Sequence, residues 1–424
     1  MRPFDYARQH LTAFLDEVQH LSTCDFPYPE CGEAVERLRQ HFSRVLEAHD
    51  KIDPAKSLQE AVRKACVDAI DNVYEYLPVL GFLHRSKDVR NPFEVFGPLL
   101  RIAVSILEPK PEWKHRKTKL IISSQWRYSP FISLQYGCLR DFLLIGLPAH
   151  MPDNPLLLPV TGHELGHALW DQLPLRGNYW KRIRNETKRM LRRDHWKREF
   201  DKLFRELAGV PVNQLPYQEV LGRSGLWALG QVEETFSDFV ALRIFGESYL
   251  YTFAYLFSPG LAGYRPPEYP NMRRRARNLE TACGEYDVVC EAGYGDTFED
   301  MEELPFDRRN EFLLRFADSM LEELVPILIK DVLQLNQLKR VSMFSGEQKG
   351  KVIKDFLDGV PVVDSASLAD ILNAAWSISE NPSLLEKVAH GRLRAKVDRH
   401  EVLKNLVLKA IEVLEFQQVL GAKR

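Results

Sequence analysis

The segment 161–169 holds the residues best suited to chemistry, because it reads Thr-Gly-His-Glu-Leu-Gly-His-Ala-Leu and contains the pattern His-Glu-x-x-His. Residues four apart share a helix face, so His163 and His167 can present their imidazole nitrogens to one metal ion. Glu164 lies beside that face and can act on a water there as general base. The pattern predicts a metal centre with Glu164 as its catalytic base. A buried helix whose histidines only satisfy hydrogen bonds is the alternative.

A catalytic zinc ion needs a third protein ligand and keeps a fourth position for water. One known pattern continues with a glycine and a third histidine, but Trp170 and Leu173 occupy those positions here. Another solution takes a glutamate from a later helix, and Glu234 and Asp238 stand four residues apart. We predict that Glu234 is a metal ligand and that Asp238 accepts a hydrogen bond from the far nitrogen of a ligand histidine. Two acids on a solvated surface are the alternative.

Glu233 adjoins Glu234 and could in principle reach the same ion. A helix turns by about 100° per residue, so Glu234 shares a face with Asp238 whereas Glu233 is rotated away. If Glu233 were the ligand, the residue four positions later would be Ser237 instead of Asp238. A hydroxyl is a weaker hydrogen-bond partner for a histidine N–H than a carboxylate is. The sequence therefore favours Glu234 as the ligand, and a Glu233→Ala variant is expected to bind zinc nearly normally.

Together, the two segments resemble the gluzincin group of zinc metallopeptidases, whose best-known type is thermolysin, since that group combines His-Glu-x-x-His with Glu-x-x-x-Asp. The resemblance covers roughly 118–285 and implies one zinc ion per chain, held by His163, His167 and Glu234. It also implies a small sheet before the motif helix, with an edge strand that pairs with an extended substrate. The 66 residues between His167 and Glu234 exceed the spacing of the compact thermolysin type.

Thermolysin-type sites also carry a later histidine or tyrosine that stabilises the developing negative charge. No histidine occurs between His195 and His390. The candidates near the motif helices are tyrosines and arginines, namely Tyr255, Tyr264, Tyr269, Arg273, Arg274 and Arg275. Among them we expect Tyr264, Tyr269 and Arg273 to be catalytic. The segment 269–275 is weakly similar to the His-Pro-Pro…Arg stretch of some intracellular gluzincins, with Tyr269 in place of the first histidine. A basic helix start on the surface is the alternative.

The segment 176–205 is strongly basic, with 12 Lys/Arg against 4 Asp/Glu, and Trp180 and Trp196 lie within it. This composition is typical of an arm that binds an acidic partner, nucleic acid or a membrane surface. The alternative is a solvated helix face whose tryptophans pack inward.

Apolar residues recur at helical spacing along most of the chain. Helices are expected over 11–21, 35–48, 57–77, 93–107, 301–335, 348–358, 366–378 and 397–418. Short apolar runs predict strands at 120–124, 131–136 and 142–147. We expect Pro54 and Pro78 to separate helices, and Asp364 or Ser365 and Ser383 to serve as N-caps.

These patterns predict an α+β, predominantly α-helical fold with a zincin-like core and a small β-sheet. We expect an N-terminal helical region over 1–112 and the core over 113–295. The core would carry a basic helical insertion at about 175–215, and a C-terminal helical region would follow over 296–424.

The composition excludes several classes of protein. The chain has 424 residues, of which 45% are hydrophobic and 27% charged, so neither a disordered nor a membrane protein is expected. A net charge of -2 argues against binding nucleic acid by bulk charge. No apolar run reaches the length of a transmembrane helix or a secretory signal. The six cysteines show no CxxC spacing, which favours free thiols and a cytoplasmic location.

The sequence thus predicts a zinc metallopeptidase that hydrolyses bonds in a peptide or protein substrate. The alternative is a non-hydrolytic regulator, in which zinc holds the fold together while the basic segment and C-terminal helices bind a partner protein or nucleic acid. Glu164 favours the enzyme, because a structural site has no need of a base. The substrate, the cleavage preference and the oligomeric state are left open.

Overall fold

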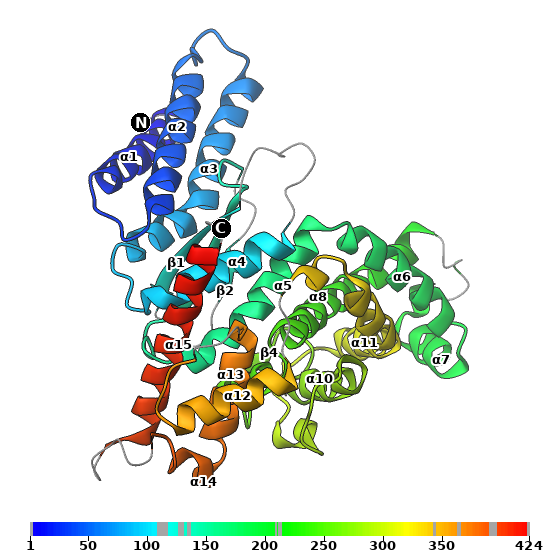
Figure 1. Cartoon of the computed structure of the whole chain (residues 1–424). Helices are drawn as coiled ribbons and strands as arrows, with labels where there is room; N and C mark the ends of the chain where they lie inside the picture. The colour runs from blue at the N-terminus through cyan, green and yellow to red at the C-terminus, as the bar shows by residue number, and fades with distance from the viewer. Residues whose placement is uncertain are drawn as a thin grey trace. The chain divides into compact units, whose positions relative to one another are not determined.

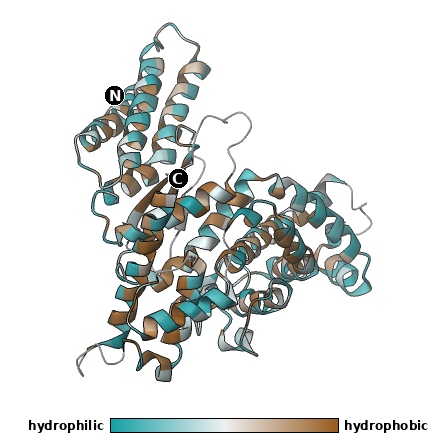
Figure 2. Ribbon diagram, in the orientation of Figure 1, coloured by the Kyte–Doolittle hydropathy of each residue, from teal (hydrophilic) through white to brown (hydrophobic). Residues whose placement is uncertain are grey.

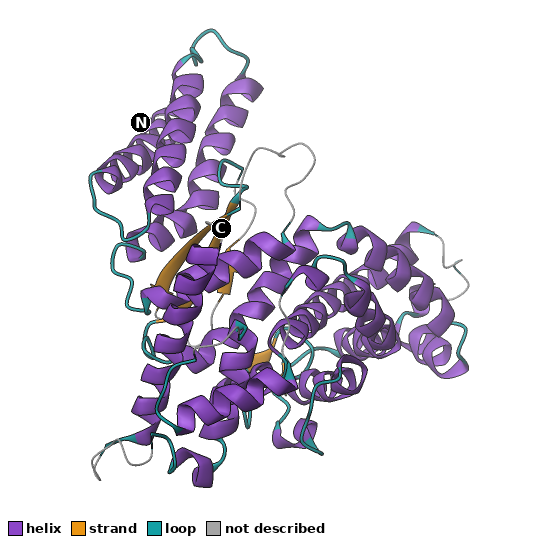
Figure 3. Cartoon of the chain, in the orientation of Figure 1, coloured by secondary structure: helices purple, strands orange, loops and turns teal. Residues whose placement is uncertain are grey.

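The computed structural model describes residues 3–107, 118–125, 131–133, 137–207, 210, 214–341, 345–362, 366–389 and 397–421. Helices dominate it, and strands are few and short (Figure 3). This confirms the predicted balance of helix and strand. The chain forms two compact units, one of residues 1–104 and 109–153 and the other of 105–108 and 154–424. The predicted three regions and the zincin-like character of the core stay predictions.

The first unit begins with three long helices that lie side by side (Figure 1). They are α1 (Pro3–Ser22), α2 (Pro29–Asp50) and α3 (Gln59–Arg85), followed by η1 (Phe93–Val95) and by α4 (Phe96–Ile106), which ends in the second unit. Leu11, Val18 and Leu38 are fully buried between the helices, and Phe14 stacks on Phe42 at 4.0 Å. The apolar spacing that predicted these helices is therefore the spacing of their buried faces.

Pro78 does not end the third helix, contrary to the sequence prediction. It lies inside α3, which continues to Arg85. Proline frees the carbonyl of Tyr74, four residues earlier, from its helical hydrogen bond. Tyr74 is 73% exposed, so water can satisfy that carbonyl, while Val79 and Leu83 beyond the proline are fully buried in the core. Burial of this last turn thus outweighs the local cost of the proline.

A three-stranded sheet completes the first unit and confirms the predicted strands. It consists of β1 (Lys119–Gln125), β2 (Phe131–Ser133) and β3 (Phe142–Pro148), with β3 in the middle. β1 pairs with β3 in parallel and β2 pairs with it antiparallel. Nearly every residue of β1 and β3 is buried, as their continuous apolar runs require. Residues 134–136, which the prediction included, lie outside the described residues.

The second unit is built around the long helix α8, which contacts α5, α6, α10 and α11. Its helices are η3 (Pro155–Val160), α5 (Thr161–Gln172), α6 (Leu175–Met190), α7 (Asp194–Leu203), η4 (Arg205–Leu207), α8 (Leu215–Phe245), α9 (Glu247–Phe257), α10 (Met272–Tyr286), η5 (Tyr294–Thr297), α11 (Arg308–Gln334), η6 (Leu338–Arg340), α12 (Gly346–Leu357), α13 (Leu368–Ser379), α14 (Pro382–Leu385) and α15 (Arg399–Gly421). Two short parallel strands, β4 (Tyr264–Arg265) and β5 (Glu302–Glu303), complete it. Figure 2 shows much of α8 in brown, whereas α6 and α7 are mostly teal.

Several predicted helix starts differ from the observed ones. The helix expected from residue 301 begins at Arg308, after Asp307 accepts a hydrogen bond from the backbone N–H of Asn310. α13 is capped by Ser367, and α14 by Asn381 rather than by Ser383. Asp364 and Ser365 lie outside the described residues. Among the helices that the structure describes, none combines the length and apolar character needed to cross a membrane.

Candidate metal centre

Helices α5 and α8 position the candidate metal ligands, and glycines let the two backbones approach closely. A Cβ atom on Gly166 would lie 2.5 Å from the Cα of Ser237, and one on Gly162 would lie 2.9 Å from the Cα of Ala241. A larger residue at either position would push the helices apart. Each glycine directly precedes a histidine of the motif. The close approach of the helices therefore lies next to the ligands themselves.

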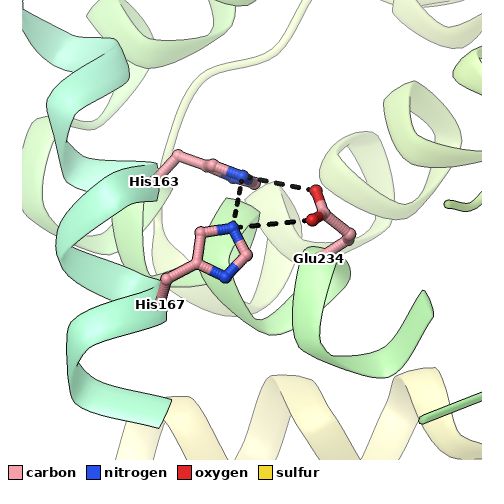
Figure 4. A group of neighbouring side chains, drawn as sticks. All are labelled: His163, His167 and Glu234. Carbon is pink, nitrogen blue, oxygen red and sulfur yellow. Dashed lines mark hydrogen bonds and ion pairs between the residues drawn. The ribbon is translucent and has the colours of Figure 1, made fainter. Parts of the chain in front are cut away.

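His163 and His167 on α5 and Glu234 on α8 form one group, whose ligand atoms all lie within 4.8 Å of one another. The Nε2 atoms of the two histidines are 3.1 Å apart. The carboxylate of Glu234 lies 3.4 Å from Nε2 of His163 and 3.5 Å from Nε2 of His167. Figure 4 shows the three side chains pointing toward one another. A group of this composition can hold a metal ion.

A carboxylate on the far side orients each imidazole ring. Nδ1 of His163 lies 2.8 Å from Oδ1 of Asp238, and Nδ1 of His167 lies 3.1 Å from Oε1 of Glu233. An ionised carboxylate only accepts hydrogen bonds, so both rings carry their proton on Nδ1. The Nε2 atoms of both rings then face each other and Glu234. A proton on Nε2 of His163, or a metal ion in its place, relieves the repulsion between these groups, so the donor set fits a metal ion.

Asp238 is itself held by a buried network. Its carboxylate accepts hydrogen bonds from Nε and Nη2 of Arg275 at 2.9 and 2.7 Å, and from the Tyr249 hydroxyl at 2.7 Å. The guanidinium of Arg275 also lies over the ring of Phe253, 5.2 Å from its centroid. Asp238 is 1% exposed and Arg275 7%. Because every partner is buried and paired, the position of His163 is tightly determined.

The charges of the group favour a bound cation. Burial opposes a charge on His163, but Asp238 and Glu234 outweigh burial and raise the pKa of His163 to about 10. Burial likewise opposes a charge on Glu234, yet His163 and Arg275 hold the pKa of this carboxyl below its usual range. The two acids thus stay ionised and supply the negative charge that a divalent cation requires.

Glu164 follows His163 on α5 and is buried, with 6% of its surface exposed. Its place beside the ligand face is the one that the sequence predicted. Its role as general base stays a prediction.

Tyr269 is 44% exposed, and its phenol is within the electrostatic influence of the ligand group. The negative charge of Glu234, followed by burial, raises the pKa of Tyr269 to about 12, so its phenol keeps the proton at neutral pH and can donate a hydrogen bond. Its backbone is fixed from behind, because the carbonyl of Tyr269 accepts a hydrogen bond from Nε of the buried Arg265 at 2.7 Å. Its role as an oxyanion stabiliser stays a prediction.

The other two predicted catalytic residues are Tyr264 and Arg273. Tyr264 belongs to β4 and is 53% exposed. Nε of Arg273 donates to the carbonyl of Phe298 at 2.8 Å. Neither joins the hydrogen-bond network of Asp238 and the histidines within the described residues. The arginine that does so is Arg275, two residues after Arg273.

Three residues take places in the site that the sequence did not predict, although Arg275 stood among the candidate oxyanion stabilisers. Glu233 is indeed rotated away from the three-ligand group, but its carboxylate meets the other nitrogen of His167. Arg275 lies on the apolar face of α10 with Met272 and Leu279, and a charge on such a face signals a buried acidic partner. Tyr249 has no comparable signal in the sequence.

The tryptophans of the basic segment 176–205 pack inward, as the packed-helix alternative expects. Trp196 is 7% exposed and meets the rings of Phe312 and Phe316 at 5.5 and 5.0 Å. The ring of Trp180 lies 3.1 Å from where a Cβ of Gly225 would stand. Neither ring is presented as a stacking platform for nucleic acid bases.

The basic side chains of the segment divide into two sets. Arg189 and Arg193 pair with Glu323 on α11 at 2.6 and 2.7 Å. Arg182 pairs with Asp331 at 3.3 Å. A second set is exposed and makes no side-chain hydrogen bond or ion pair within the described residues. This exposed basic stripe consists of Lys181, Arg184, Lys188 and Arg192.

Comparison of the chain with models of protein families, with curated proteins and with solved structures found no match in any of the three.

Proposed function

We propose that the protein is a zinc-dependent metallopeptidase that hydrolyses peptide bonds. The convergence of two imidazole Nε2 atoms and one carboxylate, each ring fixed from behind by an acid, carries the proposal. Catalytic zinc sites use three protein ligands and leave a position for water, whereas structural sites use four. The group found in the described residues has three members. Two histidines and one glutamate are also a donor set that suits zinc.

In the proposed reaction His163, His167 and Glu234 hold the zinc ion. When bound, zinc polarises the scissile carbonyl and lowers the pKa of water toward ~7. Glu164 takes the proton of the attacking water and then delivers it to the leaving amine. The phenol of Tyr269 donates a hydrogen bond to the carbonyl oxygen as negative charge develops there.

The test is a Glu164→Gln variant of the full chain, examined by metal analysis and by digestion of a broad peptide library. We expect stoichiometric zinc, an unchanged melting temperature and a rate of hydrolysis lower by ~10²–10⁴-fold or more. Glu219→Gln is the matched control, because it makes the same change at an exposed position of α8 outside the ligand group. An unchanged rate in Glu164→Gln would exclude the mechanism. Zinc binding without cleavage of any library peptide by the natural chain would favour the regulatory alternative.

A further inference from the structure

A cavity of about 210 Å³ lies in the second unit, between the start of α10 and the helix α11. It is smaller than the ~300–1,000 Å³ of sites that enclose a whole small molecule, so its size suits one side chain or one chain end. Four arginines line it, namely Arg265, Arg273, Arg274 and Arg277. Asp300, Glu303 and Asp318 line it as well, so the cavity can bind an anion only where an arginine is left without an acidic partner.

The cavity is adjacent to the candidate metal centre. Gln231, about one turn before Glu234 on α8, donates a hydrogen bond from Nε2 to Oδ1 of Asp318 at 2.9 Å, and Asp318 lines the cavity. Pro270 and Asn271 line it too, and they directly follow Tyr269. Consecutive Cα atoms are about 3.8 Å apart, so the cavity begins within one or two residue lengths of Tyr269. A peptide that crosses the metal centre can reach the cavity with a neighbouring residue.

Three of the four arginines already have a carboxylate partner. Arg265 pairs with Asp318, Arg274 with Glu322 and Arg277 with Asp296. These pairs neutralise most of the charge in the lining.

Arg273 differs, because the structure gives it no acidic partner within the described residues. Its Nε donates to the carbonyl of Phe298, and its Nη1 and Nη2 atoms remain for a ligand. A guanidinium edge of this kind suits the two oxygens of a carboxylate. Asp300 also lines the cavity and opposes a dianion, so a carboxylate is favoured over a phosphate.

We propose that this cavity binds a carboxylate of the peptide substrate through Arg273, either the free C-terminus or an Asp or Glu side chain. The proposal rests on the peptidase function proposed above. It makes Arg273 a determinant of specificity rather than an oxyanion stabiliser.

The test uses the zinc-loaded Glu164→Gln variant of the full chain, which binds peptides without cleaving them. Fluorescein-labelled random octapeptide pools are compared by fluorescence anisotropy. In one arm a free C-terminus is replaced by an amide, and in the other Asp and Glu are replaced by Asn and Gln. We expect about 10-fold weaker binding in the arm that removes the recognised carboxylate, as the loss of a charged hydrogen bond implies. The arm that responds identifies the source of the carboxylate.

Arg273→Gln, added to this variant, tests the assigned residue, because glutamine can still donate to Phe298. We expect the difference between acid and amide pools to disappear. Arg198→Gln is the control, since Arg198 pairs with Asp194 on α7 and its loss changes the net charge equally. It should keep the difference.

Equal binding of acid and amide pools overturns the proposal, as does a difference that survives Arg273→Gln. Loss of binding to both pools by the same factor also overturns it, because this is the result expected of an oxyanion stabiliser. These outcomes are distinct from failure of the peptidase function, which is read from digestion of neutral peptides by the natural chain. If no pool binds at all, the carboxylate site is wrong whatever the natural chain cleaves.

Discussion

At the scale of single residues, the carboxylates that orient the two ligand histidines differ in burial and in their own hydrogen bonds. The Asp238 side chain behind His163 is 2% exposed and receives hydrogen bonds from Arg275 and Tyr249 as well. The Glu233 side chain behind His167 is 31% exposed. Water can replace an exposed carboxylate more readily than a buried one. The two acids should therefore differ in their effect on the metal.

The first prediction ranks three acids by their effect on zinc affinity. Glu234→Ala removes a ligand and should abolish zinc retention, because two histidines alone hold zinc poorly. Asp238→Ala should weaken affinity by ~10–100-fold, and Glu233→Ala by less than about 10-fold. Titration against a zinc-chelating dye measures all three. Glu219→Ala, an exposed position on the same helix, is the control. Zinc release by Glu233→Ala with retention by Glu234→Ala would show that the ligand is wrongly assigned.

Spacing alone predicted Glu234 and Asp238, because residues four apart share a face whatever surrounds the helix. It could not predict that Glu233 reaches His167, since that contact depends on how α5 and α8 are packed. The same holds for Arg275, which meets Asp238 from a third helix. Residue pairs within one helix follow from sequence, whereas partners on separate helices require the tertiary structure.

The second prediction concerns His49 and pH. His49 is 4% exposed and stacks on Phe4 at 3.9 Å, and neither ring nitrogen has a hydrogen-bond partner among the residues that the structure describes. Burial, together with Arg8, outweighs Asp50 and holds the pKa of His49 below its usual 6.5. The neutral ring stabilises the fold above pH ~6.5, and this contribution is lost as pH falls.

Thermal unfolding of the full chain between pH 7.5 and 5 tests this expectation. As pH falls, the free energy of unfolding of the natural chain should decrease, with a slope that corresponds to uptake of at most about one proton on unfolding. In His49→Phe this slope should be smaller. His10→Gln, at an exposed position of α1, should leave the slope unchanged. A slope that persists in His49→Phe would assign the dependence to other groups.

At the scale of elements, the site depends on how closely α5 and α8 approach. The motif was recognisable from its histidines, but the part played by Gly162 and Gly166 was not. Their partners, Ala241 and Ser237, lie more than 70 residues further along the chain. Two glycines four apart on a helix indicate a close neighbour without identifying it.

The third prediction is that Gly166→Ala disrupts the centre. Its new Cβ would lie 2.5 Å from the backbone of Ser237, so the helices must separate. We expect a loss of about 1–3 kcal/mol in the free energy of unfolding and weaker zinc binding. Gly222→Ala on α8 is the matched control, because nothing lies within 4 Å of its added Cβ. That variant should gain about 0.5–1 kcal/mol. Equal effects of the two variants would show that close packing is not what positions the ligands.

The fourth prediction concerns the exposed basic stripe on α6 and just after its end. If it binds an acidic partner, replacing Lys181, Arg184, Lys188 and Arg192 by glutamine should lower the salt concentration for elution from a heparin column. Cleavage of a short neutral peptide should change little, because the stripe lies outside the ligand group. Unchanged elution would favour the solvated-face alternative.

Arg189 and Arg193 provide the contrast, because both pair with Glu323 on α11. Replacing these two by glutamine should affect stability more than elution. Their loss breaks contacts between helices, although ion pairs this exposed contribute little to stability. A large fall in the salt concentration for elution, with unchanged stability, would contradict this division of the basic residues.

At the scale of the whole molecule, each compact unit has its own hydrophobic core. The first core includes Leu11, Phe42 and Leu83, and the second surrounds α8 with residues such as Phe236 and Phe239. The helices and strands could be predicted because apolar periodicity reflects burial within each element. The grouping of the strands with the N-terminal helices could not, because it depends on contacts between elements distant in sequence.

The fifth prediction is that removal of the metal affects the two units unequally. A ligand that binds only the native state stabilises the structure that contains its site. The three candidate ligands all belong to the second unit. On treatment with EDTA, we therefore expect faster hydrogen–deuterium exchange in peptides from α5 and α8, measured by mass spectrometry. Peptides from α1, α2 and α3 should exchange at an unchanged rate, because their core contains no ligand. The Glu234→Ala variant should show the faster exchange even without EDTA and should not respond to added zinc. Faster exchange in both units alike would show that the metal's contribution is not confined to the unit that binds it.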